Sequence, residues 1–505
     1  MINQYTHNQP GLYAPSGRVL ESDLAGELPL YLYWPQDQST LLYSTSITEL
    51  LNDARVPKPL KVSTEGLSFL LQSGVVPPPK TAYQDIYILG IGDKAKVSTL
   101  NGKIDIQFSH EFPFLNANRL QADEMQPDED LILQMLAEAT ISRIDESKPS
   151  FLFHSAGKDS NSIALALAEA GWQDKVTLIT HKSKGKADES EISAKIAKQL
   201  GFKHQILHEV DQLQAEHKQA INDYFVNAPF PCTDNVTLAY PLYAHQLPEL
   251  KGANIIDGMG NDVFIGHIPS RTEFKRQQIS KYLKYSRLLS KHFPSESLFH
   301  VAGRTRAEWT GLSGLSFADV KKILPDAFDV SDFWLEKDSN QDYLDFRPSI
   351  RGTIIDQEIF TRKARNFADS INANMVLPFA NQQVAEYFAK MPEQHLFDRK
   401  ALKNKLILRK ILKDRIGLDS DALGKLGFSY DSRSIVLQNW DWMHQEMQQC
   451  PLWEQAGLLK VITRLKGVMQ SQHKYADLSG RLIYRIYMFS AWRNQSRYLK
   501  QNKQA

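Results

Sequence analysis

The sequence predicts an α/β protein: a doubly wound parallel sheet with a largely helical C-terminal part, preceded by a small β-rich N-terminal domain. Strand-like and helix-like segments alternate from residue 150, which favours a parallel sheet with helices on both faces. Short aromatic and aliphatic runs precede residue 120, and helical patterns dominate beyond residue 270. We therefore expect two domains, residues 1–120 and 121–505, in a chain long enough for both.

The first domain is predicted to contain a hairpin, a helix and further strands. Residues 28–51 hold two apolar runs separated by a polar turn, which is typical of a β-hairpin. Residues 63–72 have a helical pattern that a glycine and three prolines then end. Further strands are expected at residues 85–89 and 104–108. The acidic stretch 123–130 should connect the domains and cap the next helix.

The second domain is predicted to begin with alternating strands and helices. A helix is expected over residues 160–170. Asp188 and Glu191 have the spacing of a capping box at the start of a second helix, which Gly201 ends. We interpret Asp188-Glu189 as this helix start and not as a ribose contact. The predicted strands of the sheet are residues 151–154, 175–180, 205–207 and 254–256.

The turn after the first of these strands carries the strongest chemical signal. It reads Ser155-Ala156-Gly157-Lys158-Asp159-Ser160, and the next helix is expected to open at Ser160. A strand–turn–helix leaves backbone N–H groups free at a helix N-terminus, where anions bind. Because the turn also holds two hydroxyls and a carboxylate, it suits a polyphosphate with its magnesium better than a bare phosphate.

A second turn is expected at the same edge of the sheet. It follows the strand at 254–256 and contains Asp257, Gly258 and Asp262. Ligands of a doubly wound sheet bind beyond the carboxyl ends of its strands. The glycines of this turn permit a close approach of the backbone, so Asp262 should meet Asp159 across the crevice. Two carboxylates and phosphate oxygens form a usual magnesium shell.

The bulk composition excludes several classes of protein. A net charge of +1 gives no field that would attract nucleic acid or an acidic membrane. The only cysteines, Cys232 and Cys450, indicate neither a disulfide framework nor a zinc site. Neither a secretory signal nor an apolar run of membrane-spanning length is present. We therefore expect a soluble cytoplasmic protein without a nucleic-acid or membrane partner; a homodimer is compatible with the sequence.

Five segments resemble motifs of one family, in the family's order. Ser155–Ser160 resembles the S-G-G-x-D-S loop of the N-type ATP pyrophosphatases. Gly258–Asp262 resembles the G-E-G-[AS]-D loop of the asparagine synthetase branch. The later segments resemble E-V-R-V-P-F-L-D, K-x-x-L-R and K-x-G-F of the same branch, at residues 374–381, 405–409 and 425–428. Residues 150–430 thus resemble the asparagine synthetase-like family.

The resemblance implies ATP and Mg²⁺ as cofactors and a role for each motif. Asp159 and Asp262 should hold Mg²⁺. Lys425 should face the phosphates and the tetrahedral intermediate as a catalytic cation, and Lys405 should support it. The residues expected to bind ATP are Ser155, Ala156, Gly157, Lys158, Asp159, Ser160 and Gly258.

The reaction implied by the family is an ATP-dependent ligation. ATP is cleaved between its α and β phosphates, a substrate carboxylate becomes an acyl-adenylate, and pyrophosphate leaves. An amine then attacks the activated carbonyl, which gives an amide and AMP. The partners are therefore a small-molecule or peptide carboxylate and an amine, neither of which the sequence identifies.

The N-terminal part departs from the family pattern. Glutamine-using asparagine synthetases carry a catalytic cysteine directly after the initiator methionine, where this chain has Ile2. The region before residue 120 resembles only the latter part of a glutaminase domain, so we interpret it as degenerate and truncated. We expect no glutamine hydrolysis, and the amine should be free ammonia, ammonia from a partner, or an amino group on a substrate.

The second loop also departs from the pattern. Met259 stands where the family has Glu, or Tyr in β-lactam synthetases, and a thioether cannot accept a proton from an amine. Val263 follows the loop aspartate, which is nearer to the β-lactam synthetase pattern, and Ala156 replaces a usual glycine. Two alternatives therefore stay open: a nucleotide-binding scaffold without catalysis, and an intramolecular cyclase that closes a lactam or macrolactam.

Overall fold

A parallel five-stranded sheet organises the larger part of the chain in the computed structural model. The structure describes residues 2–5, 18–184, 188–283, 285–339, 341–423 and 430–500. The sheet has the order β10-β9-β8-β11-β12, and all neighbouring strands are parallel. Its strands are β8 (Ser150–Phe153), β9 (Val176–Lys182), β10 (Lys203–His208), β11 (Asn254–Ile256) and β12 (Asn374–Val376). The strand order reverses between β8 and β11, where a ligand crevice is expected in such sheets.

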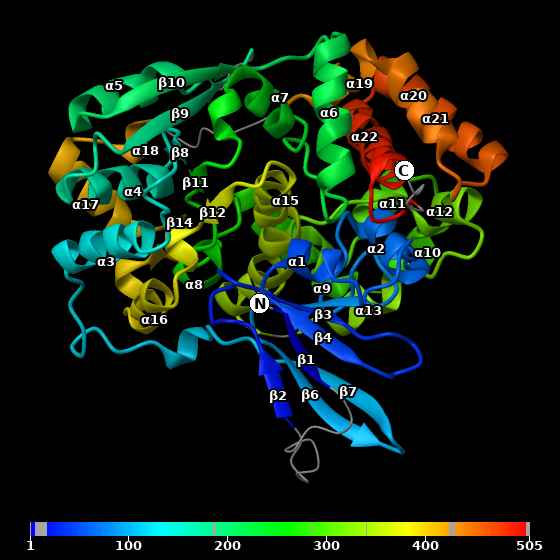
Figure 1. The fold of residues 1–505 in the computed structure, drawn as a ribbon, viewed down its shortest axis with the longest axis horizontal. Coiled ribbons are helices and arrows are strands. Elements are labelled where there is room, and N and C mark those ends of the chain that lie inside the picture. Colours follow the sequence, from blue (N-terminus) through cyan, green and yellow to red (C-terminus); the bar gives the residue numbers. More distant parts are fainter. Residues whose placement is uncertain are drawn as a thin grey trace.

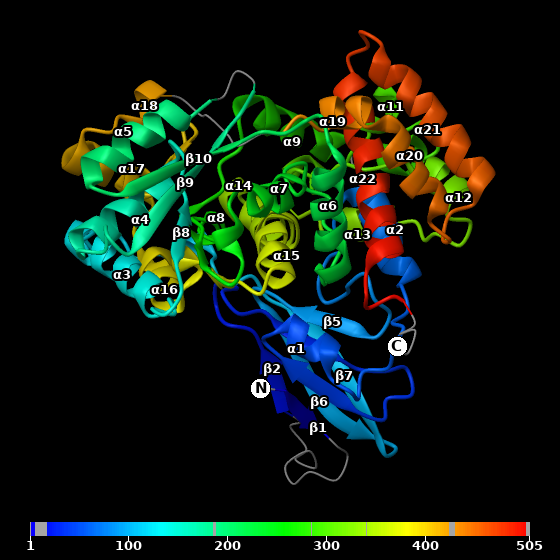
Figure 2. The same cartoon turned by 45° about the horizontal axis from the view of Figure 1, so that its top comes forward.

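Helices cover both faces of this sheet, as the sequence predicts (Figures 1 and 2). Leu152 and Ile256 belong to a buried cluster with the helices of one face, whereas Phe151 and Ile255 belong to the cluster of the other face. The first face carries α3 (Glu129–Ile141), α4 (Lys158–Glu169), α5 (Ser190–Leu200) and α17 (Leu406–Ile416). The second face carries α7 (Ala239–Gln246) and α15 (Arg362–Ser370), with α6 (Ala215–Asn227) beyond them. The predicted fold class is confirmed.

Two antiparallel sheets form the N-terminal part, with the orders β1-β4-β3-β5 and β2-β6-β7. The hairpin predicted at 28–51 is confirmed as β3 and β4, but the last residues of that range form the helix α1. The predicted helix is confirmed as α2, which ends at Gly74 in the left-handed conformation. The elements are β1 (Asn3–Tyr5), β2 (Arg18–Glu21), β3 (Leu30–Tyr33), β4 (Leu41–Ser44), α1 (Ile47–Asn52), α2 (Thr64–Ser73), β5 (Ile86–Leu89), β6 (Asp93–Leu100) and β7 (Lys103–His110).

The strand β6 is absent from the sequence prediction. It pairs along its whole length with β7. Lys94 and Lys96 are exposed and alternate with buried Asp93, Ala95 and Val97, so the strand has few large apolar residues. A weak alternation of this kind is easily missed in a polar segment.

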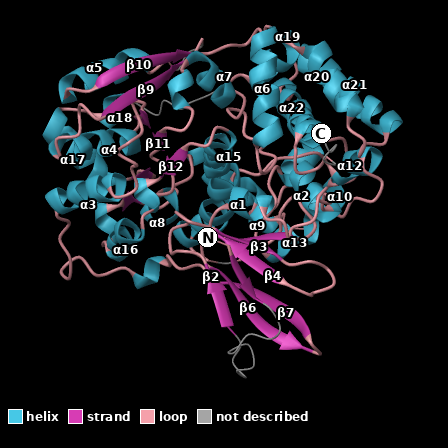
Figure 3. Cartoon of the chain, in the orientation of Figure 1, coloured by secondary structure: helices cyan, strands magenta, loops and turns pink. Residues whose placement is uncertain are grey.

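The remainder of the chain is largely helical, as predicted (Figure 3). Exceptions are β12, which lies inside the predicted motif 374–381, and the short pair β13 (Phe397–Asp398) and β14 (Lys403–Asn404). The α-helices are α8 (Asp262–Ile265), α9 (Arg271–Tyr282), α10 (Ser286–Ser290), α11 (Leu298–Ala302), α12 (Phe317–Ile323), α13 (Ser331–Glu336), α14 (Tyr343–Arg347), α16 (Gln382–Lys390), α18 (Ser420–Leu423), α19 (Ser432–Gln438), α20 (Trp440–Gln449), α21 (Gln455–Gln470) and α22 (Ala476–Gln495). A π-helix, η4 (Pro348–Thr361), runs directly into α15. Short 3₁₀ turns are η1 (Asn116–Asn118), η2 (Pro248–Leu250), η3 (Glu308–Thr310), η5 (Pro378–Ala380) and η6 (Glu393–His395).

The N-terminal part packs against the helical part through α2. The indole N–H of Trp334 donates to Ser73 Oγ at 2.7 Å, and both residues are buried. Gln72 Nε2 donates to the carbonyl of Phe328 at 2.6 Å. The division at residues 120 and 121 stays a prediction. Within the described part of the chain, no helix is both long enough and apolar enough to cross a membrane.

Candidate active site

The turn after β8 is held by hydrogen bonds among its own residues. Gly157 has an extended backbone and precedes the first turn of α4, which therefore begins at Lys158. The predicted start at Ser160 was wrong by two residues, and Asp159 lies in the first helical turn. The backbone N–H of Ser155 donates to Ser160 Oγ at 3.2 Å, and that of Gly157 donates to Ser155 Oγ at 3.0 Å.

The second turn touches the first at Gly258. A Cβ at this position would lie 3.0 Å from Asp159 Cβ and 3.1 Å from the backbone nitrogen of Ser160. A larger residue here would require the start of α4 to shift by a few tenths of an ångström. Asn261 then reaches across, and its Nδ2 donates to Asp159 Oδ1 at 2.7 Å.

Lys405 joins the two turns from the start of α17. Its backbone is left-handed, with φ 58°, and the residue is 5% exposed. Its Nζ lies 2.7 Å from Asp159 Oδ2 and 2.8 Å from Asp262 Oδ1. Burial alone would lower the pKa of Lys405, but the two carboxylates more than offset that effect and raise it above its usual value. Asp159 and Asp262 thus meet across the crevice and share the ammonium of Lys405, while their binding of Mg²⁺ stays a prediction.

The residues around Asp262 fit a divalent cation. Ligand atoms of Asp262, His267 and Asp356 all lie within 4.8 Å of one another. Asp356 Oδ2 is buried and has no hydrogen-bond partner among the described residues. Burial raises the pKa of Asp356 to about 7, although Arg351 opposes this rise. Magnesium prefers such carboxylate oxygens together with phosphate oxygens.

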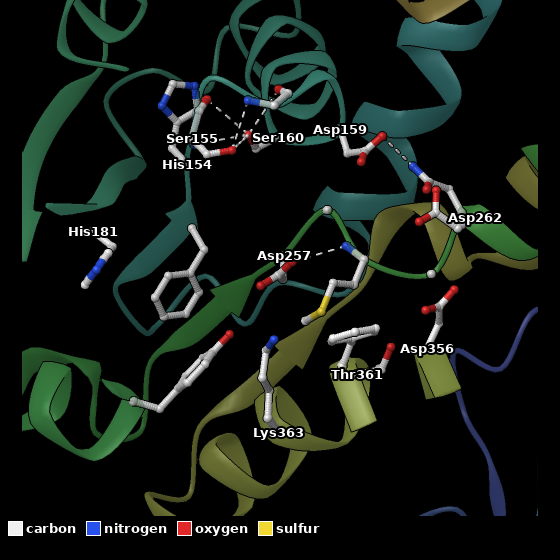
Figure 4. Close-up of a pocket in the computed structure, with 18 of the residues that line it drawn as sticks. His154, Ser155, Asp159, Ser160, His181, Asp257, Asp262, Asp356, Thr361 and Lys363 are labelled. Carbon is white, nitrogen blue, oxygen red and sulfur yellow. Dashed lines mark hydrogen bonds between the residues drawn. The ribbon is translucent and has the colours of Figure 1, made fainter. Parts of the chain in front are cut away.

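Both turns line one cavity of about 340 Å³ (Figure 4). Four predicted residues of the first turn lie in its wall: Ser155, Gly157, Asp159 and Ser160. Gly258 and Asp262 line it from the second turn, whereas Ala156 and Lys158 are not among the lining residues. Lys425, with residues 426–428 of its motif, lies outside the described residues.

Sequence reasoning missed the wall that η4 and α15 contribute. π-Helices are rare overall, but those that occur are often at functional sites. No sequence motif predicts them. Gly352 was a weak signal: a Cβ there would lie 2.8 Å from Val263 Cβ, so the glycine brings η4 against the second turn. The lining residues from these elements are Arg351, Gly352, Asp356, Gln357, Phe360, Thr361 and Lys363.

Glu189 lies at the start of a helix, as predicted, but its contact with the first turn was missed. The predicted capping box is not formed, because α5 begins at Ser190 and Asp188 Oδ1 accepts the Ser190 N–H at 3.0 Å. Glu189 is 6% exposed and turns toward the first loop, where its Oε2 accepts the Ala156 N–H at 2.8 Å. Burial raises its pKa. A carboxylate therefore occupies one N–H donor of the candidate phosphate loop.

Comparison with known proteins gives the family. The asparagine synthase family model matches residues 131–493, which include both turns, Lys405 and the cavity wall. A search of curated proteins found no match. The resemblance to β-lactam synthetases stays a prediction. With more than half of its length matched, the chain belongs to the asparagine synthase family and is an ATP-dependent, amide-forming ligase of the asparagine synthetase type.

Proposed function

We propose that the chain adenylates a substrate carboxylate, releases pyrophosphate and passes the acyl group to an amine, with AMP as the other product. The observation that carries this proposal is the sharing of one buried cation by Asp159 and Asp262 next to the α4 N-terminus. Two carboxylates from separate turns, beside the N-terminus of a helix, suit the charge of a magnesium polyphosphate.

Each turn has a separate task in this reaction. The hydroxyls of Ser155 and Ser160 and the N–H of Gly157 would bind phosphate oxygens, after exchanging their present bonds within the loop. Asp159 and Asp262 would hold Mg²⁺, which neutralises phosphate charge when it is bound. Lys405 keeps a positive charge beside the departing pyrophosphate, and we assign the same task to Lys425 by its motif.

We infer that the amine does not come from glutamine hydrolysed by this chain. A glutaminase of this family needs a thiolate nucleophile, and the chain has only Cys232 and Cys450. Both are buried, and burial raises the pKa of each thiol to about 11. Neither is suited to attack an amide near neutral pH. Free ammonia, a partner's ammonia, or an amino group on the substrate remains as the acceptor.

Pyrophosphate release from ATP and Mg²⁺, measured with a pool of carboxylic acids, tests the proposal. Asp159→Asn and Lys405→Ala should lower release at least about 100-fold, as expected for removal of transition-state charge stabilisation. Lys413→Ala on the exposed side of α17 is the matched control and should leave release unchanged. ATP binding without release for any acid would overturn the ligase and favour the scaffold.

A further inference from the structure

Asp257 lies at the C-terminal end of β11, with its carboxylate in the cavity beside Met259 (Figure 4). Its Oδ1 accepts the backbone N–H of Met259 at 3.1 Å. An amine must lose a proton to become an amide nitrogen, and the thioether of Met259 cannot accept one. If the protein itself supplies the proton acceptor, it must be another side chain near Met259.

The groups that face Asp257 leave its charge only partly balanced. Lys363 approaches from α15, Tyr240 from α7 and Asp159 from α4. Lys363 is 7% exposed, and its Nζ already lies 3.2 Å from Asp234 Oδ1. The ammonium of Lys363 is thus shared by the carboxylates of Asp234 and Asp257. When all three are ionised, Lys363, Asp234 and Asp257 together carry a formal charge of −1. An uncompensated carboxylate in a cavity attracts a cation.

The other carboxylates of the described cavity wall are engaged elsewhere. Asp159 and Asp262 bind Lys405, and Glu189 accepts an N–H of the phosphate loop. Asp356 Oδ1 lies 3.5 Å from Arg351 Nε, and its Oδ2, which has no partner among the described residues, belongs to the candidate cation site with Asp262 and His267. Enclosure in the cavity raises the pKa of Asp257 to about 6, with Lys363 acting against this rise. A carboxylate with a pKa near the working pH is a competent general base.

We propose that Asp257 binds the ammonium form of the acceptor amine and takes up its proton. This inference rests on the proposed ligase function. The ammonium gives one proton to an Asp257 oxygen. The nitrogen lone pair then forms the C–N bond, the C–O bond to the adenylate phosphate breaks, and its electron pair leaves with AMP. The remaining extra proton on nitrogen passes to water.

In the Asp257→Asn variant, adenylation of the acid and formation of the amide are measured separately. Asparagine keeps an oxygen for the Met259 N–H but cannot accept a proton. Acid-dependent exchange of pyrophosphate into ATP should stay within about threefold of wild type. Amide formation from ammonium chloride should fall by about 10²–10⁴, the usual contribution of general-base catalysis. Hydroxylamine, which is unprotonated at neutral pH, should still form the hydroxamate.

Asp369→Asn is the matched control. Asp369 lies on α15, burial also raises its pKa to about 6, and it does not line the cavity. This variant should retain both half-reactions. Equal losses with ammonium and hydroxylamine, or no loss with ammonium in Asp257→Asn, would overturn the role of Asp257.

Carbon-13 NMR of the carboxyl groups provides a readout that needs no turnover. The Asp257 signal, assigned by its loss in Asp257→Asn, should titrate near pH 6 in wild type. Ammonium chloride should lower that midpoint, because a bound cation favours the carboxylate. An unchanged midpoint would overturn the binding site. If wild type releases no pyrophosphate with any acid, the ligase proposal fails separately.

Discussion

The ammonium of Lys405 lies 2.7 Å from the carboxylate of Asp159, although the two residues are 246 positions apart in the chain. Its second carboxylate partner, Asp262, belongs to the other turn. Lys405 therefore holds the two halves of the candidate ATP site together, and it occupies the position between the carboxylates that a divalent cation would share.

Replacement of Lys405 by methionine should destabilise the protein and make its stability depend on Mg²⁺. The two carboxylates would lose their cation, and breaking a buried ion pair commonly costs ~3–5 kcal/mol. Asp159 and Asp262 keep 29% and 35% of their side-chain surface exposed, so we expect about 2 kcal/mol in urea unfolding. Added Mg²⁺ should restore part of this loss in the variant and have a smaller effect on wild type.

Lys403→Met is the control for that prediction. Lys403 lies two residues away, is 44% exposed and pairs with Asp421 at the surface. Exposed ion pairs contribute ~0–1 kcal/mol, so little change is expected. A Lys405→Met variant as stable as this control would contradict the structural role of Lys405.

Gly258→Ala should lower pyrophosphate release while the protein still folds. The added methyl would lie 3.0 Å from Asp159 Cβ and 3.1 Å from the Ser160 nitrogen, so it would push the phosphate loop slightly away from the second turn. Release should fall by up to about 10²-fold, the loss expected when a reacting group moves by about 1 Å. Circular dichroism and steady-state release measure the two effects separately.

Gly467→Ala provides the matched glycine control. Gly467 lies in α21, and a Cβ there would meet nothing within 4 Å. Alanine should stabilise this helix by ~0.5–1 kcal/mol and leave release unchanged. Normal release in Gly258→Ala would show that the two turns need not touch.

The sequence predicts the parts of the site that lie where strands of the sheet end. The turns after β8 and β11 combine a buried strand, glycines and a carboxylate within a few residues, so local patterns suffice. The contacts of Lys405 and Glu189 depend on long-range packing that brings α17 and α5 to the first turn. The η4 wall has no local signature either, because π-helices are rare and no sequence pattern marks them.

Glu189→Gln should strengthen ATP binding. The Glu189 carboxylate competes with phosphate for the Ala156 N–H and places a negative charge beside the loop. Glutamine keeps the size and an acceptor oxygen but removes the charge, so the Kd of ATP, measured by calorimetry without turnover, should fall severalfold. Glu191→Gln on the same helix, whose predicted capping contact is not formed, is the control and should leave the Kd unchanged.

The same effect predicts a pH dependence of ATP affinity. Burial raises the pKa of Glu189, so its charge is lost at a higher pH than that of an ordinary glutamate. As the pH falls through this raised pKa, the wild-type Kd should approach that of Glu189→Gln, and the ratio of the two should shrink toward one. A ratio that is constant with pH would show that Glu189 does not compete with phosphate.

Acid should destabilise the fold partly through His154, at the end of β8. Burial lowers its pKa to about 4, while Asn161 Oδ1 lies 2.9 Å from its Nε2. The unfolded chain, with a histidine pKa near 6.5, binds more protons than the folded protein between pH 6.5 and pH 4. Stability should therefore fall as the pH drops through this window, by at most about 3 kcal/mol from this residue, since one pKa unit corresponds to ~1.4 kcal/mol.

Urea unfolding of wild type and His154→Gln at pH 7.5 and pH 5 measures the contribution of His154. The variant should be less stable than wild type at pH 7.5 but should lose less stability between the two pH values. An equal loss in both proteins would place the acid sensitivity elsewhere, for example at buried His300, whose pKa burial also lowers.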